Sequence, residues 1–347
     1  MNDELITAHD PITPSRPARR GTGLEPRPAA ATALTLEENT QALLDRAAAQ
    51  VLDGQAAAAF RLLTPPLSAL WSEARATGRA DAMREWCRTH PLHALVIQDP
   101  FTQRAVAKPR GYAGDAVMMD FIYDGEPPAG TSAIGADVFR ATTRAGMGLS
   151  VRYRRQLLQS LIDDTVVRHE RPRLLSVAAG HCRELQGSLV ESAGFGGEFV
   201  ALDQDLLSCQ EIARAHTGHA VRVVNQGVRE LAGSSQGSVL ADALGGFDLI
   251  YSAGLYDYLP DALARRLTRR LLAMLRPGGR LLVANFVPGG SGRGYMELFM
   301  DWTLVLRSEA QMRELATAAG AAHASTFADP QRNVVYAELW REVPEAV

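Results

Sequence analysis

Cysteine is scarce in this chain, the net charge is small, and no apolar run is long. Of 347 residues only three are cysteine, Cys87, Cys182 and Cys209, and they form no CxxC pair. No histidine cluster stands at metal-ligand spacing either, so the sequence indicates neither a disulfide framework nor a metal site. A net charge of -3 provides no basic field for a nucleic-acid backbone. The apolar runs fall well short of the roughly 18 residues of a membrane span.

The beginning of the chain also lacks a secretion signal. Residues 1–33 are rich in proline, alanine and arginine, without an apolar stretch or a hydrophobic period. Such a composition cannot bury enough apolar surface to offset the entropy of ordering, and it carries no export signal. We therefore expect a flexible arm here and a cytoplasmic protein.

Residues 34–147 have the pattern of a helical domain. Thr35 and Glu38 have the spacing of a capping box, and apolar residues then recur on one helical face. Two further helical patterns follow, and Pro65 and Pro66 are expected to break the first of them. These patterns cover residues 63–77 and 81–93. We expect this domain to bind the substrate or to act as a lid.

Residues 148–347 open with a long amphipathic helical pattern and then alternate between strand-like and helical runs. The expected strands are 173–178, 198–202, 220–224, 247–252, 280–285, 322–327 and 333–339. This alternation predicts a mostly parallel sheet with helices on both faces. The last two strands are separated by a connection too short for a crossover helix, so they should form an antiparallel hairpin.

The first expected strand runs into a loop of small residues. Ala178, Ala179 and Gly180 permit a ligand to approach the backbone closely, and the amides of the next helix would be donors to a carboxylate. The second strand ends in Asp203, at the distance from this loop that a ribose-binding carboxylate needs. The alternative for Asp203 is a strand-end or helix-capping role. The cofactor-side candidates are Ser176, Ala178, Ala179, Gly180, His181, Arg183, Glu184, Asp203, Gln204, Asn225, Gln226, Val228, Ser252, Ala253 and Gly254.

A cofactor with a pyrophosphate needs more glycine than this loop contains. Gly180 stands alone, whereas the dinucleotide-binding fingerprint G-x-G-x-x-G has two further glycines. A nicotinamide-dependent dehydrogenase is therefore disfavoured. S-adenosyl-L-methionine fits better, because it has a ribose, an adenine and a carboxylate but no phosphate.

Together, the loop, Asp203 and two later segments resemble the class I, Rossmann-like methyltransferases that use S-adenosyl-L-methionine. The later segments are Phe-Asp-Leu-Ile-Tyr-Ser at 247–252 and Leu-Arg-Pro-Gly-Gly-Arg at 275–280. The resemblance implies a Rossmann-like sheet with one antiparallel strand, transferase activity of class EC 2.1.1.-, and S-adenosyl-L-homocysteine as a product. The chain departs from the glycine-rich class pattern at Ala178 and Cys182.

Three further stretches are similar to a bacterial subgroup of this class. They are Lys-Pro-Arg-Gly-Tyr-Ala-Gly-Asp at 108–115, Ser-Ala-Gly-Leu-Tyr-Asp-Tyr-Leu at 252–259, and Glu-Leu-Phe-Met-Asp-Trp-Thr-Leu-Val-Leu-Arg at 297–307. Enzymes of this subgroup form the methyl ester of 3-hydroxypalmitic acid, which is an extracellular factor. This similarity implies a role in secondary metabolism.

Ligands of doubly wound sheets lie beyond the carboxyl ends of the strands, so residues after the fourth and fifth strands should face the methyl acceptor. We also interpret the turn 108–115 as a lid, in which Lys108 and Arg110 pair with an anionic acceptor. The alternative for these two cations is a structural ion-pair cluster with Asp115. The substrate-side candidates are Lys108, Arg110, Tyr112, Asp115, Tyr123, Tyr256, Tyr258, Asn285, Arg293 and Arg307.

Methyl transfer is an in-line displacement, so the protein mainly has to hold the nucleophile behind the methyl carbon. A carboxylate is already ionised at neutral pH, whereas a hydroxyl, amine or carbon acceptor needs a base. The catalytic candidates are Tyr256, Asp257 and His181; packing beneath the next helix is the alternative for Tyr256, and helix capping for Asp257.

The function that we expect is carboxyl O-methylation of an acyl or other organic acid. Methylation of another natural product at oxygen, nitrogen or carbon, or a non-catalytic module that binds S-adenosyl-L-methionine, are the alternatives. The expected partner is a small anionic acceptor, and a homodimer is left open.

Overall fold

A computed structural model describes residues 34–233 and 236–342, and the part from Thr35 onward forms one compact unit. The expected flexible arm, residues 1–33, lies outside the described residues. None of the helices in the described ranges is both long and apolar enough to cross a membrane.

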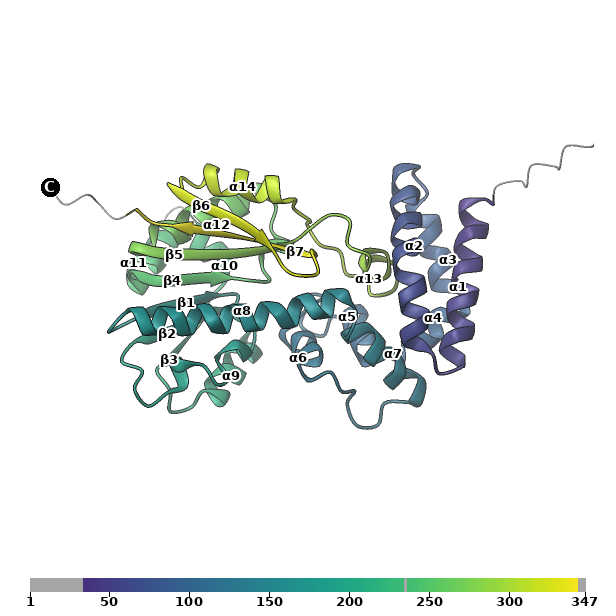
Figure 1. The fold of residues 1–347 in the computed structure, drawn as a ribbon, viewed down its shortest axis with the longest axis horizontal. Helices are drawn as coiled ribbons and strands as arrows, with labels where there is room; N and C mark the ends of the chain where they lie inside the picture. Colours follow the sequence, from purple (N-terminus) through teal and green to yellow (C-terminus); the bar gives the residue numbers. More distant parts are fainter. Residues whose placement is uncertain (1–33, 234–235, 343–347) are drawn as a thin grey trace, which may run out of the picture. The chain divides into compact units, whose positions relative to one another are not determined.

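Helices alone make up the described chain before the first strand (Figure 1). Their bounds are α1 Leu36–Leu52, α2 Ala56–Ala76, α3 Ala80–Thr89, α4 Pro91–Val96, α5 Pro100–Ala107, α6 Ala116–Asp124, α7 Ala133–Thr143 and α8 Gly146–Arg168. The predicted capping box starts α1: Thr35 Oγ1 accepts from Glu38 N at 3.2 Å, and Glu38 Oε2 accepts from Thr35 N at 2.8 Å. The predicted long helix is α8, whereas α5, α6 and α7 were not predicted.

The prediction that Pro65 and Pro66 break a helix is wrong. Both prolines lie inside α2, a helix of 21 residues. Leu63, Leu67 and Trp71 lie on either side of the prolines and are fully buried. Burial of these side chains stabilises the helix where the missing amide donors would end it in isolation.

Seven strands form one sheet, of order β3-β2-β1-β4-β5-β7-β6. Their bounds are β1 Arg173–Val177, β2 Glu198–Asp203, β3 Val221–Asn225, β4 Phe247–Ser252, β5 Leu275–Phe286, β6 His323–Ala328 and β7 Val334–Trp340. Within this sheet only β7 runs against the others, between β5 and β6. The predicted fold is therefore confirmed: a Rossmann-like sheet, mostly parallel with one antiparallel strand, preceded by helices.

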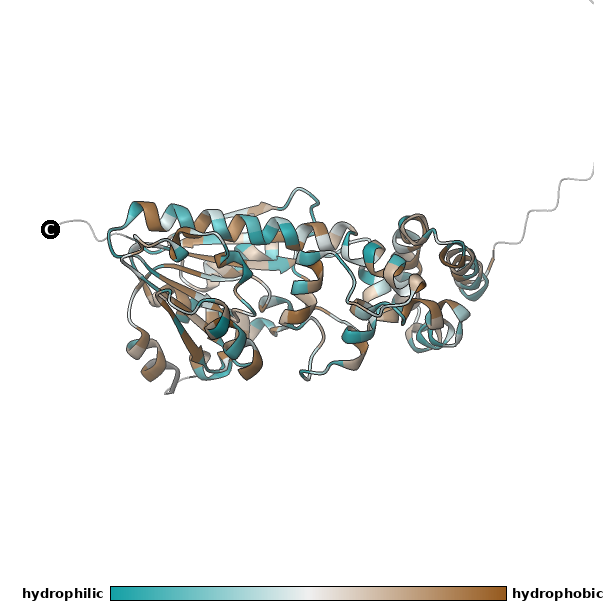
Figure 2. Cartoon of the chain, turned by 90° about the horizontal axis from the view of Figure 1, so that it is seen from below, coloured by the Kyte–Doolittle hydropathy of each residue, from teal (hydrophilic) through white to brown (hydrophobic). Residues whose placement is uncertain are grey.

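Helices cover both faces of the sheet (Figure 1). On one face α8 and the N-terminal helices share a core with Leu174, Phe199 and Tyr251 of the strands. On the other face Leu175 and Ile250 pack in a second core with four of the helices that follow β1. These four are α10 Val228–Ala232, α11 Gln236–Leu244, α12 Asp261–Ala273 and α14 Glu309–Ala318. The other two, α9 Leu206–Ala215 and α13 Arg293–Phe299, contribute to the first core. Figure 2 shows the strands largely hydrophobic and the helices mixed, as expected for a sheet buried on both sides.

Candidate active site

The loop after β1 turns sharply at the carboxyl end of the strand. Ala178, Gly180 and Cys182 have φ values of 57°, 59° and 51°, in the left-handed region that favours glycine. Ala179 N donates to Leu202 O at 3.1 Å, which ties the loop to β2. The loop therefore keeps a backbone conformation that is costly for two of its side chains, a feature that clusters at ligand sites.

The helix expected directly after this loop does not form. A 3-10 turn of three residues, η1 (Arg183–Leu185), follows instead, and a second one, η2 (Leu189–Glu191), comes after it. So short a turn does not align the amides and peptide dipoles that make a helix N-terminus attract anions. The prediction of helix amides for the cofactor carboxylate is therefore wrong.

Asp203 ends β2 and faces the same loop. Its carboxylate accepts from Gly180 N and from Asp205 N, both at 2.8 Å. The helix-capping alternative falls to Asp205, whose side chain accepts from Leu207 N at the start of α9. Burial raises the pKa of Asp203, whose side chain lies in the wall of a cavity. Its carboxylate fixes the loop and faces the space where a ligand would lie.

That cavity has a volume of about 740 Å³ and opens at the carboxyl ends of β1, β2 and β4. Its size falls within the range of small-molecule sites. The cofactor-side candidates in its wall are Ser176, Ala178, Ala179, Gly180, His181, Arg183, Glu184, Asp203, Gln204, Val228, Ala253 and Gly254. The acceptor-side and catalytic candidates there are Arg110, Tyr112, Tyr123, Asp257 and Tyr258. The structure thus brings most of the predicted residues together, while their binding roles stay predictions.

Three cofactor-side candidates lie behind the wall. Asn225 Nδ2 donates to the carbonyl oxygens of Asp203 and Gln204, at 3.0 and 3.1 Å. Gln226 N donates to Asp203 O at 3.0 Å, and Ser252 Oγ donates to a backbone carbonyl of β1 at 2.9 Å. These three residues hold the strand ends in place and do not line the cavity.

Several acceptor-side candidates also lie outside the wall. Asp115 caps α6 and binds Arg104, with an Nη2 to Oδ2 distance of 2.7 Å. Lys108 pairs with the exposed Asp301 at the surface. Tyr256 is fully buried, and its hydroxyl is 2.8 Å from the Thr268 hydroxyl. The surroundings of Tyr256 therefore agree with the alternative that this side chain packs beneath the next helix.

The remaining three candidates are linked to backbone and acids inside the fold. Arg307 Nη1 donates to Asn285 Oδ1 at 2.7 Å and to the carbonyl of Tyr256 at the same distance. Arg293 Nε donates to Glu297 Oε1 at 2.6 Å. Neither arginine nor Asn285 lines the main cavity, because each side chain is already held by groups of the protein.

Ion pairs fasten the turn 108–115 to the sheet rim. Arg110 Nη1 donates to Asp205 Oδ2 at 2.6 Å, so its partner is on the β2–α9 loop and not Asp115. His181 Nδ1 lies 2.7 Å from Asp120 Oδ2, which also accepts from Arg183. Burial raises the pKa of Asp120, but the hydrogen bonds from Arg183 and His181 outweigh this effect and lower it to about 2. The turn therefore lines the cavity, and its wall cation Arg110 is already paired with an acid.

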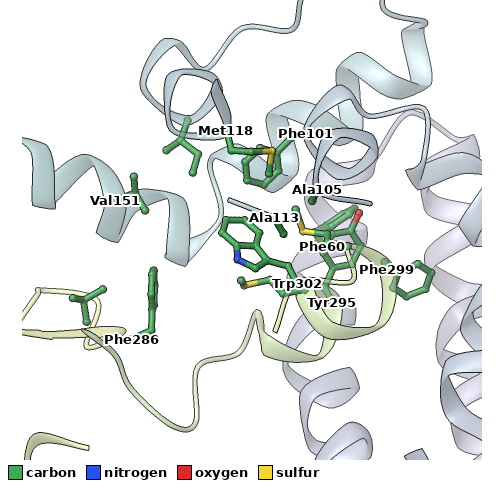
Figure 3. Packing of buried hydrophobic residues seen from close by; sticks show 14 of the residues in the cluster. Phe60, Phe101, Ala105, Ala113, Met118, Val151, Phe286, Tyr295, Phe299 and Trp302 are labelled. Atoms are coloured by element: carbon green, nitrogen blue, oxygen red, sulfur yellow. The ribbon is translucent and has the colours of Figure 1, made fainter. Parts of the chain in front are cut away.

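The half of the cavity beyond the strands is apolar. Phe60 and Tyr295 contact each other with ring centroids 4.8 Å apart, and Trp302 lies beside Phe101 (Figure 3). On the other side of the same cluster Phe286 faces α8 (Figure 3). All five side chains belong to the cavity wall. An apolar body of an acceptor would be desolvated there.

One acid faces the boundary between the two halves. Asp257, in the turn after β4, is 3% exposed, and its Oδ1 accepts from Phe286 N at 2.7 Å. Burial raises the pKa of Asp257 to about 7, although Phe286 N and the charges of Arg154 and Arg307 lower it. A carboxyl group with such a pKa can exchange protons near neutrality. Tyr258 is adjacent, and its hydroxyl accepts from Trp302 Nε1 at 2.8 Å.

Sequence reasoning missed three charged residues of the wall, Asp120, Arg154 and Arg229. Asp120 organises His181 and Arg183, and no sequence spacing relates it to either. Arg154 interrupts the apolar stripe of α8 and lies in the cavity wall. A cation within the apolar face of a helical pattern is the sequence signal that could have identified Arg154.

Among solved structures the chain resembles a possible exported protein from Bordetella parapertussis. The identity is 20% and the TM-score 0.57, with 92% of this chain and 100% of that chain covered. At this identity the likeness shows a shared fold. The cytoplasmic location and the 3-hydroxypalmitic acid subgroup stay predictions.

Two weaker likenesses are to methyltransferases. A magnesium protoporphyrin IX methyltransferase from Synechocystis PCC 6803 with bound S-adenosylhomocysteine is 13% identical, with a TM-score of 0.40, over 56% of this chain and 85% of that one. The N-methyltransferase NodS from Bradyrhizobium japonicum WM9, in complex with the same compound, is 13% identical, with a TM-score of 0.39, over 56% and 88%. No protein-family model and no curated protein matches the chain.

Proposed function

We propose that the protein is an S-adenosyl-L-methionine-dependent methyltransferase that acts on a small organic molecule, with carboxyl O-methylation as its leading chemistry. The observation that carries the proposal is the joint position of the Gly180 loop and Asp203 in the wall of a large cavity. Fold and loop chemistry are consistent with this activity, and the acceptor is inferred from the other half of the cavity.

The residues of the sheet rim fit an adenosyl cofactor. Asp203 presents a carboxylate that can accept from the ribose hydroxyls, as charge-assisted hydrogen bonds. Gly180 gives the loop a positive φ without a Cβ, so the backbone can lie against the ligand. A pyrophosphate would need a helix N-terminus after the loop, and the 3-10 turn η1 stands there instead. The site therefore favours a nucleoside cofactor without phosphate.

When bound, S-adenosyl-L-methionine supplies an electrophilic methyl group on its sulfonium. The contribution of the chain is to hold the acceptor atom in line and to exclude water. Phe286, Trp302 and Tyr295 would hold the apolar body of the acceptor. A carboxylate acceptor needs no base, because it is ionised at neutral pH.

Methylation of a hydroxyl, amine or carbon is the second candidate, and Asp257 is the observation that favours it. Its pKa of about 7 would let it take the proton that such an acceptor loses. The non-catalytic module is the third candidate, favoured by the departure of the loop from the helix-forming pattern.

Calorimetry with S-adenosyl-L-homocysteine tests the cofactor site. Asp203→Asn should weaken binding by about tenfold or more, because the charged acceptor for ribose is lost. Asp124→Asn is the matched control, since Asp124 is exposed at the end of α6 and does not line the cavity. If the wild type does not bind this compound, the proposed function is wrong.

An assay of S-adenosyl-L-homocysteine formation separates the three candidates. Turnover with carboxylic acids supports the leading chemistry. Turnover only with hydroxyl, amine or carbon acceptors supports the second candidate, and loss of that turnover in Asp257→Asn would assign the base. Binding without turnover over the whole panel would favour the non-catalytic module.

A further inference from the structure

Arg154 is a buried cation in the cavity wall with no acid bound to it. It lies in the middle of α8 and is 7% exposed. Its Nη1 donates to Ala253 O at 2.6 Å, and its Nη2 lies 3.4 Å from the sulfur of Met119. Within the described ranges no aspartate or glutamate oxygen lies within 4.0 Å of its guanidinium. The Tyr123 side chain is a further hydrogen-bonding neighbour, and none of these three partners is an acid, so the positive charge of Arg154 is not neutralised by an ion pair.

The other buried arginine of the described residues, Arg307, has a carboxylate: it binds Asp261 at 2.7 Å. The partly buried Arg110 and Arg104, which lie near the cavity, also bind acids, at 2.6 and 2.7 Å. A buried charge without a counterion is expensive, because its desolvation is not repaid by a close opposite charge. The arrangement of Arg154 is therefore that of a residue whose counterion arrives with a ligand.

The acids near Arg154 are bound to other groups. Asp257 accepts from Phe286 N, and Glu184 accepts from the Tyr251 hydroxyl at 2.6 Å. Burial raises the pKa of both carboxyl groups, to about 7 for Asp257. Burial lowers the pKa of Arg154, but neighbours that include Tyr123, Tyr336 and Asp257 outweigh this effect and hold it above its ordinary value. Neither Asp257 nor Glu184 forms an ion pair with the guanidinium within the described residues, so a close counterion is missing.

The position of Arg154 suits a ligand that reaches across the cavity. Val151, Arg154 and Leu158 line the wall from one face of α8, as the i, i+3 and i+7 spacing requires. A Cβ on Gly254 would lie 3.7 Å from the Arg154 guanidinium, which places this cation against the loop after β4. Val151 faces the apolar cluster one turn away (Figure 3). Arg154 thus lies where the polar rim of the sheet meets the apolar half.

We propose that Arg154 binds a carboxylate inside the cavity. A guanidinium matches the two oxygens of a carboxylate with a fork of donors. The loop after β1 offers no helix N-terminus for such a group, so a side-chain cation is needed. Two sources have this chemistry, the acid group of the methyl acceptor and the methionyl carboxylate of the cofactor. The second source, and the description of the first as an acceptor, rest on the proposed function.

Paired ligands test the proposal by calorimetry, each pair differing mainly in the carboxylate. S-adenosyl-L-homocysteine is compared with 5′-methylthioadenosine, which has no amino-acid part, and octanoate is compared with octanamide. In Arg154→Met the carboxylate member of one pair should bind about tenfold more weakly or worse, while its uncharged partner binds as before. The pair that responds identifies the source of the carboxylate.

Two further variants control for general damage to α8. Arg152→Met removes a neighbouring arginine that donates to Thr143 O and does not line the cavity, so it should change neither pair. Arg154→Lys keeps the charge without the fork and should lose part of the affinity for the carboxylate member. If Arg154→Met does not fold, this selective loss in Arg154→Lys supports the proposal, and its absence overturns it.

The results that overturn the proposal differ from those that reject the proposed function. Equal losses for both members of a pair, unchanged binding in Arg154→Met, or a wild type that binds neither carboxylate would remove Arg154 from this role. A wild type that binds neither adenosyl compound but binds octanoate through Arg154 would keep the carboxylate site and reject the methyltransferase.

Discussion

At the scale of single residues, the buried carboxyl of Asp257 should make stability depend on pH. Its pKa in the folded state, about 7, is above the model-peptide value, so the folded state binds this proton more tightly than the unfolded state. The contribution is therefore present at low pH, and it is lost as the pH rises from about 4 to about 7. At pH 8 the wild-type protein should therefore be less stable than a variant in which residue 257 carries no charge.

Asp257→Asn tests this effect. The amide keeps an oxygen for Phe286 N but has no proton to lose, so the variant should melt higher than the wild type at pH 8 by roughly 2 °C or more. At pH 5 the two melting temperatures should be closer. Thermal unfolding followed by circular dichroism at both values measures the difference, with Asp124→Asn as the exposed control. An equal offset at both pH values would contradict the assignment.

The sequence predicted the site residues that follow directly from strand ends. Gly180 and Asp203 come at the ends of β1 and β2, where a parallel sheet collects ligand-binding residues. Arg307 was predicted on a different ground, as a cation for an anionic acceptor. Its guanidinium turns inward instead, because carbonyls of the turn after β4 accept from it, and the conformation of that turn is not encoded in a spacing. Arg154 was missed because only the folded chain brings α8 to the sheet rim.

At the scale of elements, the β6–β7 hairpin depends on one buried carboxylate. Asp329 accepts from Asn333 N and Val334 N at 2.8 and 2.7 Å, and from the Ser150 hydroxyl of α8 at 2.6 Å. The residue is 2% exposed. It therefore fixes the turn that positions the antiparallel strand and also joins that turn to the helix carrying Arg154.

Removing this carboxylate should destabilise the protein. Asp329→Ala leaves buried amides without an acceptor, so the free energy of unfolding should fall by on the order of 3 kcal/mol. Asp329→Asn keeps one acceptor oxygen and should lose less, and the exposed Glu314→Ala should change little. Urea unfolding measures all three variants. Equal stability of Asp329→Ala and the wild type would show that the hairpin does not need this residue.

Element prediction worked where local pattern and tertiary packing agree. The predicted strands other than β5 have ends within one residue of those observed, because alternation and buried runs are local signals. β5 begins at Leu275, earlier than predicted, because Pro277 and the adjacent glycines were taken for a turn. α2 runs through its prolines, because the burial of Trp71 outweighs the loss of amide donors. Both features depend on residues that are close in space but distant in sequence, so local patterns could not predict them.

At the scale of the whole molecule, the N-terminal helices are joined to the sheet-bearing part through Glu297 of α13. Glu297 Oε2 accepts from Trp71 Nε1 at 2.8 Å, and its other oxygen accepts from Arg293. The first hydrophobic core also continues from α1 to the strands. The helices and the sheet should therefore unfold together, although the sequence suggested two separate domains.

Glu297→Ala should lower the temperature of one common unfolding transition without splitting it. The loss of a buried, doubly bonded acid costs on the order of 3 kcal/mol, or roughly 5 °C for a chain of this size. Differential scanning calorimetry measures the change, with the exposed Glu73→Ala of α2 as the control. Two separate transitions in the wild type would show that the two parts fold independently.

The three buried cysteines report on the opening of three different places. Cys87 lies in α3, Cys182 in the loop after β1, and Cys209 in α9. Burial raises the pKa of every one of these thiols, to about 12 for Cys87, so none should react with an alkylating reagent while its surroundings stay closed. The rate at which iodoacetamide reacts with each sulfur therefore measures how often that part of the native protein opens locally. If a bound cofactor keeps the Gly180 loop closed, iodoacetamide should react more slowly with Cys182 when the cofactor is present.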